Sequence, residues 1–485
     1  MPRLFFTTLL LATLLASCAP RSLPAAPQPS ILLEDCALVS SFGDQVDARC
    51  GTLTVPENRA EPAGRQIDLY IAVVPAVKRN PEPDPLFLLA GGPGQSAIET
   101  FPAIISFMSR INADRDIVLV DQRGTGKSNP LQCLNPEDES LSAEQALAQL
   151  KDCPTKLSTT ADLRFYTTEI AMADLDAVRA ALGYESINLY GASYGTRAAL
   201  TYLRLFPEHV RTLTLDAVVD PGFIMYLDAG RDGQSSLEQF FGRCEADEAC
   251  ARAFPELRTE LNGLLSRLEA QPAEVSIRHP RTNQPLNLTV TRQLVLNMIF
   301  STLYLPELTA TLPASIHTAY TEENYAPLVT QGFMADSGIY DGMFYAVACT
   351  EDAPLISAEQ ARQASAGSVF GNLTENFVSV CTTWPKGAVS ADFRQPVVSD
   401  VPALILSGEA DPITPPVHAQ QVTDSLTNEL HLIYAHMGHG NISSRCSMNI
   451  LRDFLESASV AGLDSSCVAE VVPPPFFVNF NGPRP

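Results

Sequence analysis

Short apolar runs bounded by turn residues recur along the chain and predict buried strands. Their apolarity is continuous rather than alternating, which is typical of strands buried on both faces of a parallel sheet. Segments with apolar residues at helical spacing separate them, most clearly 168–182, which ends at Gly183. Strands that alternate with helices predict an α/β fold, with a mostly parallel sheet flanked by helices. The predicted strands lie at 86–90, 117–120, 187–190, 213–215 and 403–406.

Two regions depart from this alternation. Ahead of it, residues 51–56 and 66–77 are typical of an antiparallel pair joined by a turn-rich segment. After Pro221 the alternation stops and resumes only near Val401. The intervening residues contain helical patterns and one polar, strand-like pair around 275–290, so we expect a mainly helical cap domain inserted into the sheet.

Composition excludes one class of partner. The 485 residues are 46% hydrophobic and 18% charged, which is typical of a globular chain with a substantial core. The net charge is -23, and no cluster of Lys and Arg could follow a phosphate backbone. We therefore do not expect nucleic acid as a partner, and we interpret the acidity as a well-solvated surface.

The first residues resemble an export signal. Arg3 precedes an apolar run at 4–15 that is too short to stay in a bilayer as a spanning helix, and small residues follow it. The sequence LASC, ending at Cys18, resembles the lipobox of bacterial lipoproteins, in which the cysteine is lipidated; the alternative is an ordinary secretory signal cleaved nearby. Both interpretations predict an exported protein of the periplasm or cell envelope, anchored to a membrane if Cys18 carries lipid and otherwise secreted.

These patterns divide the chain into five expected parts. They are a signal peptide, of lipoprotein type, at 1–18, a Pro- and Ala-rich tether at 19–35, the N-terminal part of the core at 36–221, the cap insertion at 222–398 and the C-terminal part of the core at 399–485.

The cysteines predict disulfides. Without Cys18, ten of the 11 cysteines remain, an even number in a chain expected to be exported. Sequence alone does not determine the pairing, and we take neighbouring cysteines as the hypothesis. A zinc site is not expected, because no CxxC pair occurs. The hypothetical pairs are Cys36–Cys50, Cys133–Cys153, Cys244–Cys250, Cys349–Cys381 and Cys446–Cys467.

A candidate nucleophile stands at Ser193. It lies in the sequence GASYG at 191–195, directly after the predicted strand at 187–190 and directly before a helical pattern. A serine on a sharp strand-to-helix turn needs small neighbours, because the backbone packs closely there while the hydroxyl stands clear of the sheet. This context favours a catalytic serine over a structural Gly-Ser turn.

A serine hydroxyl needs a base, and the base needs an acid that fixes its tautomer. Asp411 follows the strand at 403–406 and a short turn, and His439 follows a strand-like segment and is flanked by glycines. Both therefore occupy loops at the carboxyl ends of later strands, in the order nucleophile, acid, histidine that this arrangement requires. The alternatives for the acid are Glu409, Asp216 and Asp220, and the alternative base is His436.

Acyl transfer also needs donors for the oxyanion. One is expected to be the backbone amide of Tyr194, directly after the nucleophile. The other is expected from Gly91 or Gly92, in the sequence AGGPG that follows the strand at 86–90. The simpler interpretation of AGGPG is a tight turn. Because AGGPG occurs in the same chain as the candidate serine turn, we favour an oxyanion loop.

Several motifs together resemble the proline iminopeptidase and tripeptidyl aminopeptidase family of α/β-hydrolases. The resemblance spans roughly residues 45–470, and CTTWP at 381–385 is similar to the C-terminal part of the tripeptidyl branch. One departure is Ala90, where proline iminopeptidases usually carry His. The motifs are LAGGPG at 89–94, DQRGTGKS at 121–128, GASYGTR at 191–197, SGEADPITPP at 407–416 and GHG at 438–440.

The resemblance implies a serine exopeptidase with an α/β-hydrolase fold, whose partner is a peptide with a free N-terminus. Such an enzyme must bind a protonated amine, which demands a carboxylate. Glu351 and Asp352 are the candidates, partly by similarity to acidic residues of the family's cap; the alternative is a solvated surface pair.

We expect an aminopeptidase, of proline iminopeptidase or tripeptidyl aminopeptidase type, that works through an acyl-enzyme with no metal or organic cofactor. The alternatives are a carboxylesterase with the same triad and, outside enzymes, a lipoprotein that only binds peptides.

Overall fold

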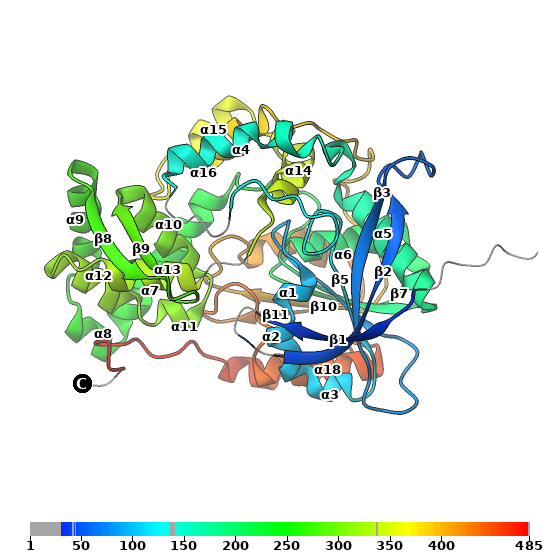
Figure 1. Cartoon of the computed structure of the whole chain (residues 1–485). Helices are drawn as coiled ribbons and strands as arrows, with labels where there is room; N and C mark the ends of the chain where they lie inside the picture. The colour runs from blue at the N-terminus through cyan, green and yellow to red at the C-terminus, as the bar shows by residue number, and fades with distance from the viewer. Residues whose placement is uncertain (1–30, 41–42, 44, 136–140, 336–337, 484–485) are drawn as a thin grey trace, which may run out of the picture.

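A nine-stranded sheet forms the body of the molecule, in the order β1-β2-β3-β5-β4-β6-β7-β10-β11 (Figure 1). The computed structural model describes residues 31–40, 43, 45–135, 141–335 and 338–483. The strands β1, β2, β3 and β5 pair antiparallel, and β5, β4, β6, β7, β10 and β11 run parallel. The strands of the sheet are β1 (Glu34–Val39), β2 (Gln45–Pro56), β3 (Gln66–Val74), β4 (Leu86–Leu89), β5 (Ile117–Val120), β6 (Ile187–Ala192), β7 (Val210–Asp216), β10 (Ala403–Gly408) and β11 (Glu429–Tyr434).

The predicted α/β architecture is confirmed. Each predicted strand is present, and the parallel strands β4, β5 and β10 are buried at every position, as continuous apolarity implies. The predicted antiparallel pair is β2 and β3, and the predicted helix at 168–182 is α5. The edge strand β1 was not predicted from the sequence.

Helices cover both faces of the sheet. One face packs against α5 and α6, and the other against α1, α2 and α18. The helices that flank the sheet are α1 (Ala97–Thr100), α2 (Pro102–Ile105), α3 (Ser109–Asn112), α5 (Thr168–Leu182), α6 (Tyr194–Leu205), α17 (Gln420–Ser425) and α18 (Arg445–Ser457).

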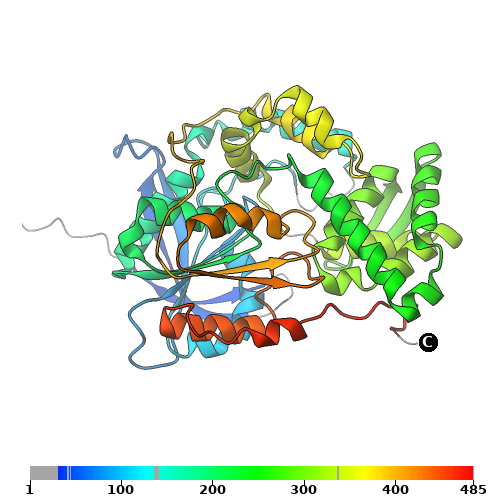
Figure 2. The same cartoon turned by 180° about the vertical axis from the view of Figure 1, so that it is seen from behind.

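The segment between β7 and β10 builds a lobe and an upper layer. The lobe, α7–α13 with the β8–β9 hairpin, has an apolar core of its own and stands beside the sheet (Figures 1 and 2). The upper layer, α14–α16, also includes α4, which comes from the chain before α5 (Figure 1). These elements are α4 (Ala143–Leu157), α7 (Ala229–Ala246), α8 (Glu248–Ala253), α9 (Leu257–Ala270), β8 (Ala273–Arg278), β9 (Pro285–Val290), α10 (Arg292–Leu303), α11 (Pro306–Thr309), α12 (Leu312–Thr321), α13 (Ala326–Met334), α14 (Asp341–Glu351), α15 (Ala358–Ser365) and α16 (Leu373–Cys381).

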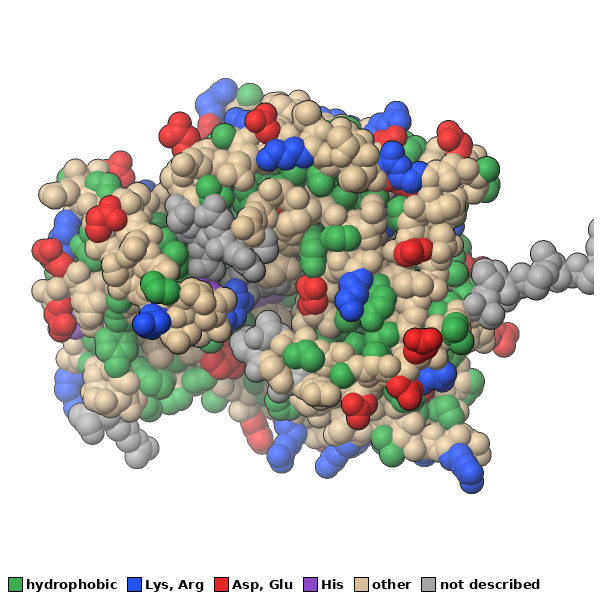
Figure 3. All heavy atoms as spheres, viewed as in Figure 1, with side chains coloured by type: hydrophobic (Ala, Val, Ile, Leu, Met, Phe, Trp, Pro, Cys, Tyr) green, Lys and Arg blue, Asp and Glu red, His purple; other side chains and the backbone are tan. Residues whose placement is uncertain are grey.

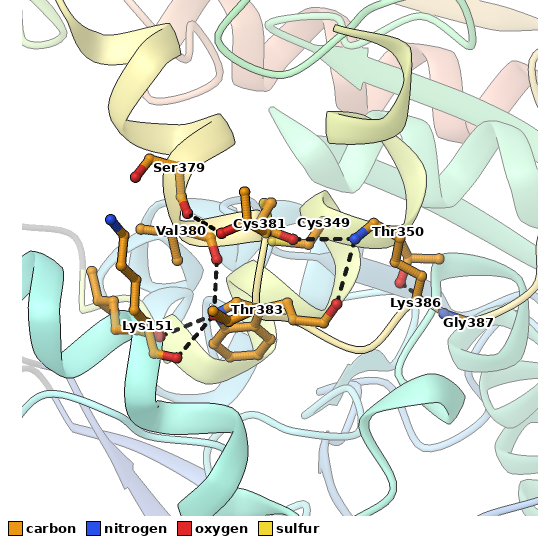
Figure 4. Close-up of a disulfide and its surroundings, with 12 residues drawn as sticks. Lys151, Cys349, Thr350, Ser379, Val380, Cys381, Thr383, Lys386 and Gly387 are labelled. Carbon is orange, nitrogen blue, oxygen red and sulfur yellow. Dashed lines mark hydrogen bonds between the residues drawn. A yellow bond between two sulfur atoms is a disulfide. The ribbon is translucent and has the colours of Figure 1, made fainter. Parts of the chain in front are cut away.

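The five predicted disulfide pairs are confirmed. The pair Cys349–Cys381 joins α14 to α16 inside the upper layer (Figure 4). Close to it, the Thr383 hydroxyl donates to the carbonyl of Lys151 in α4 at 2.9 Å. The disulfide and this hydrogen bond therefore hold α4 and the two later helices together.

The C-terminal segment connects the body to the lobe. After α18 the chain runs along the molecule to the lobe (Figures 1 and 2), where Phe477 N–H donates to the carbonyl of Ala310 at 2.9 Å. Phe476 is buried in the apolar core of the lobe, and the guanidinium of Arg243 lies 4.0 Å from its ring centroid. None of the helices in the described ranges is long and apolar enough to span a membrane.

Candidate active site

The predicted nucleophile, acid and base all follow strands at the same edge of the sheet. Ala192 at the end of β6 pairs with Asp216 at the end of β7, and Asp216 pairs with Leu406 of β10. Because carboxyl ends of parallel strands meet at one edge, the loops after β6, β10 and β11 meet there as well. In Figure 3 the surface is hollowed between the lobe and the body, and histidine side chains are visible in the hollow.

Ser193 occupies a strained turn between β6 and α6. Its backbone has φ 55° and ψ -125°, a conformation that a residue with a side chain rarely adopts. The flanking glycines permit it: a Cβ on Gly191 would lie 2.3 Å from the carbonyl oxygen of Gly195, and a Cβ on Gly195 would lie 2.2 Å from that of Leu89. The GxSxG spacing is therefore explained by close backbone approach on both sides of the serine.

Asp411 and His439 form a hydrogen-bonded pair. His439 Nδ1 lies 2.8 Å from Asp411 Oδ2, and Asp411 is buried. The other carboxylate oxygen, Oδ1, accepts from the backbone N–H groups of Ile413 and Thr414, both at 2.9 Å. Since a carboxylate only accepts, Nδ1 carries the proton and Nε2 is the basic nitrogen.

Thr414 adds a contact that the sequence did not suggest. Its hydroxyl donates to Asp411 Oδ2 at 2.8 Å and lies 3.1 Å from His439 Nδ1. A signal for this contact is present in the sequence, because Thr414 follows Asp411 by three residues. At this spacing an Asp side chain can accept hydrogen bonds from the turn that follows it.

The pair is electrostatically coupled. Burial alone would raise the pKa of Asp411, but attraction to His439 and the hydrogen bonds that Asp411 accepts hold this pKa below its ordinary value. Burial alone would lower the pKa of His439, but Asp411, with a smaller effect from Asp216, raises it above its ordinary value of 6.5. The site thus stabilises a charged imidazolium next to an ionised carboxylate.

Ser193 and His439 are connected through Asp216. The N–H of Ser193 donates to the backbone carbonyl of Asp216 at 2.9 Å, and the Asp216 carboxylate accepts the N–H of Asn441, two residues after His439. Among the described residues no hydrogen bond joins the Ser193 hydroxyl to the His439 ring, so that contact stays a prediction.

The alternative acids and base have other partners. The exposed side chain of Glu409 accepts the N–H of His436 at 3.0 Å, and the two side chains lie 3.5 Å apart. Asp220 accepts the N–H of Gly222 at 2.6 Å. None of these contacts involves the ring of His439.

The GGPG loop lies against the nucleophile. A Cβ on Gly91 would lie 3.0 Å from Ser193 Cβ. The N–H of Gly91 donates to Gln95 Oε1 at 2.9 Å, a contact that the sequence did not suggest. Tyr194 is the first residue of α6, where a backbone N–H has no acceptor within the helix. The assignment of Tyr194, Gly91 and Gly92 to an oxyanion hole stays a prediction.

Glu351, the last residue of α14, and Asp352 directly after it are both buried. Asp352 accepts hydrogen bonds from Arg197 of α6 at 2.9 and 3.2 Å and from Arg394 at 2.8 Å. Glu351 accepts the N–H and the hydroxyl of Thr168 at 2.7 and 2.9 Å. Burial raises the pKa of Glu351 to about 7, against the attraction of Arg197. The alternative of a solvated surface pair is therefore wrong, and binding of a substrate amine stays a prediction.

The lobe contacts the histidine directly. The N–H of His439 donates to the carbonyl of Tyr304, just after α10, at 2.8 Å, and the two rings meet edge to face with centroids 4.9 Å apart. This contact depends on how the inserted segment folds back, which no local pattern indicates. In the part of the chain that the structure describes, no group of three or more His, Cys, Asp or Glu could hold a metal ion.

Comparisons with known proteins agree with this fold. A family model described as alpha/beta hydrolase fold matches residues 84–444. A tripeptidyl aminopeptidase of Streptomyces coelicolor is 32% identical over 217 residues, which are 40% of this chain and 39% of that protein. The chain thus matches about two fifths of the length of this relative.

Two mycobacterial relatives match over a greater length. The serine protease Hip1 of Mycobacterium tuberculosis is 26% identical over 405 residues, covering 76% of this chain and 77% of that protein. A protein named carboxylesterase B, also from Mycobacterium tuberculosis, is 27% identical over 403 residues and covers 76% of each chain.

Proposed function

Since the chain belongs to the α/β-hydrolase fold family, we propose that it is an exported serine exopeptidase that hydrolyses peptide bonds near free N-termini. The observation that carries this proposal is the Asp411–His439 pair, 2.8 Å apart, at the sheet edge where Ser193 stands in its strained turn. The names of the relatives, tripeptidyl aminopeptidase and serine protease, support peptides as substrates.

The reaction proceeds through an acyl-enzyme. His439 Nε2 takes the Ser193 proton as the serine oxygen bonds to the scissile carbonyl carbon, and Asp411 stabilises the resulting imidazolium. The oxyanion accepts hydrogen bonds from the backbone N–H groups of Tyr194 and of Gly91 or Gly92. His439 then protonates the leaving amine, the C–N bond breaks, and water cleaves the ester in the second half of the cycle.

Of the two acids proposed for the substrate amine, Glu351 is the better candidate. Asp352 is already neutralised by two arginines, whereas the Glu351 carboxylate is 3.7 Å from its nearest cation, Arg197. A Glu351→Gln variant should raise KM for substrates with a free N-terminus and leave KM for N-blocked esters unchanged. An equal change for both classes would contradict this role.

The five disulfides indicate an oxidising compartment, and we propose that the chain is exported and anchored through lipid on Cys18. Cys18 and the proposed signal peptide at 1–18 lie outside the described residues. Metabolic labelling with radioactive palmitate, compared with a Cys18→Ser variant, tests the anchor. A soluble, unlabelled mature protein would support ordinary secretion instead.

A substrate panel tests the activity. Tripeptidyl, prolyl and other aminoacyl p-nitroanilides should be cleaved, N-acetylated versions should not, and short-chain p-nitrophenyl esters measure esterase activity. Ser193→Ala should abolish every activity, whereas Ser457→Ala, at an exposed position at the end of α18, should leave all of them unchanged. Cleavage of esters alone would favour a carboxylesterase, the name of one relative. Peptide binding without turnover, unchanged in Ser193→Ala, would favour a binding protein.

A further inference from the structure

We propose that Asp216 is a positioning residue that holds the loop carrying His439 at a fixed position relative to the turn carrying Ser193. This inference rests on the proposed function, because it gives Asp216 a part in the same hydrolytic site. Its basis is that hydrogen bonds from one buried residue reach the backbone of both loops.

The position of Asp216 in the sheet suits this role. It is the last residue of β7, which lies between the strand that precedes Ser193 and the strand that precedes Asp411. Its side chain is fully buried. The loops that carry Ser193, Asp411 and His439 follow β6, β10 and β11. In the sheet, β6 and β10 lie directly beside β7, and β11 lies beside β10.

The hydrogen bonds of Asp216 tie the two loops together. Its backbone carbonyl accepts the N–H of Ser193 at 2.9 Å. Its carboxylate accepts the N–H of Asn441 at 2.9 Å on both oxygens, and Oδ2 also accepts the N–H of Ile442 at 3.0 Å and the hydroxyl of Tyr190 at 2.9 Å. Asn441 and Ile442 follow His439 by two and three residues, so the carboxylate fixes the position of the backbone just after His439.

These contacts require a group that only accepts. Both carboxylate oxygens of Asp216 face backbone N–H donors, so an asparagine would turn its NH2 group against at least one of them. Donor would then oppose donor in a buried position, which costs free energy unless the loop moves away. Asp216→Asn is nearly isosteric, and its main effect should therefore be displacement of the histidine loop.

The negative charge of Asp216 also acts on His439. The charged and titratable groups that face this ring are Asp411 from the β10 loop, Asp216 from β7 and Tyr304 from the lobe. Burial raises the pKa of Asp216 to about 6, against the hydrogen bonds from Asn441 and Tyr190 and the attraction of His439. At pH 7 and above Asp216 is therefore mostly ionised, and its loss should lower the pKa of His439.

Covalent labelling of Ser193 by a fluorophosphonate probe tests the role of Asp216. The probe needs an activated serine but no peptide substrate, and its rate is measured from pH 5 to 9 on the folded, full-length mature chain. For Asp216→Asn we expect labelling about 10 to 100 times slower at pH 8, with the midpoint of the pH profile at lower pH. Asp220→Asn removes a charge from another buried aspartate that does not contact the histidine loop, and should label at the wild-type rate with an unchanged midpoint.

The outcomes separate the two proposals. If wild-type protein is not labelled at Ser193, the hydrolase proposal fails, and with it the role of Asp216. If wild-type protein is labelled and Asp216→Asn matches it in rate and midpoint, only the role of Asp216 is refuted. If Asp216→Asn does not fold, Tyr190→Phe removes one donor and keeps the charge; we expect slower labelling, and the wild-type rate would overturn the proposal.

Discussion

Asp411→Asn should lower kcat more than its small change in shape implies, because the hydrogen-bond donors around Asp411 fix the orientation of the new amide. Asp411 Oδ1 accepts two backbone N–H groups, from Ile413 and Thr414. The amide oxygen of asparagine must take this position, since its NH2 group would clash with both donors. The NH2 group then replaces Oδ2 and faces His439 Nδ1, which lies 2.8 Å from that oxygen.

This orientation forces His439 into the wrong tautomer. Nδ1 must accept from the asparagine, so the ring proton moves to Nε2, which can then no longer take the proton of Ser193. The loss in kcat should be about 10⁴-fold, or roughly 5 kcal/mol of transition-state stabilisation. Asp411→Ala, which leaves either tautomer accessible, should lose no more activity than Asp411→Asn.

Hydrolysis of an activated ester or p-nitroanilide measures the effect, with thermal unfolding as a check of the fold. Glu409→Gln is the matched control, because Glu409 is exposed, lies two residues away and bonds the N–H of His436. It should keep wild-type activity. In Asp411→Ala, the largest of the effects that raise the pKa of His439 is lost while burial still lowers this pKa, so the acid limb of the pH profile should move to lower pH. A loss below tenfold in Asp411→Asn, in a folded protein, would refute the assignment of Asp411.

Three further predictions concern stability. Replacing Cys349 and Cys381 by serine opens a loop with a separation of 32 residues and should lower the free energy of unfolding by about 4 kcal/mol, as measured in urea. Phe476→Ala removes a side chain buried in the lobe and should cost about 3 to 5 kcal/mol in the same assay. Glu351 has its pKa raised to about 7 in the folded state, so its contribution to stability is complete below its ordinary pKa and is lost as pH rises through 7. As pH rises from 5 to 8, the free energy of unfolding should therefore fall less in Glu351→Gln than in wild type.

Each of these predictions has an outcome that contradicts it. Unchanged urea midpoints would show that the disulfide does not constrain the unfolded chain, or that Phe476 does not anchor the C-terminal segment. Equal pH dependence in Glu351→Gln and wild type would show that the Glu351 carboxyl titrates normally. The matched control for Phe476 is Phe480→Ala, an exposed residue of the same segment, which should have little effect.

The sequence predicted those parts of the fold whose signal is local. The central strands β4 and β5 are apolar at every position, and α5 shows helical spacing and ends at a glycine in the left-handed conformation. The strand β1 was missed because four of its six residues, EDCALV, are exposed and it lies at the edge of the sheet. The helix α4 was missed because its apolar residues are sparse and Pro154 lies inside it.

The candidate site likewise contains some residues that a local sequence pattern indicates and some contacts that no local pattern indicates. Ser193, Asp411 and His439 could be predicted as candidates because each stands at a strand end with small or turn-forming neighbours. The contacts of Asp216 and Tyr304 with the loop that carries His439 could not be read from the sequence, because they are hydrogen bonds to backbone groups 135 to 226 residues away. Such contacts are set by the path of the loops, and residue type gives no signal of them.

Every disulfide in the described chain links one cysteine to the next one along, with separations of 6 to 32 residues. If the polypeptide crosses a membrane from its N-terminal end, each thiol meets its correct partner before any competitor has emerged. Oxidation in order of arrival then yields the native pattern without reshuffling. Maturation after such a crossing should therefore need an oxidant but little help from an isomerase.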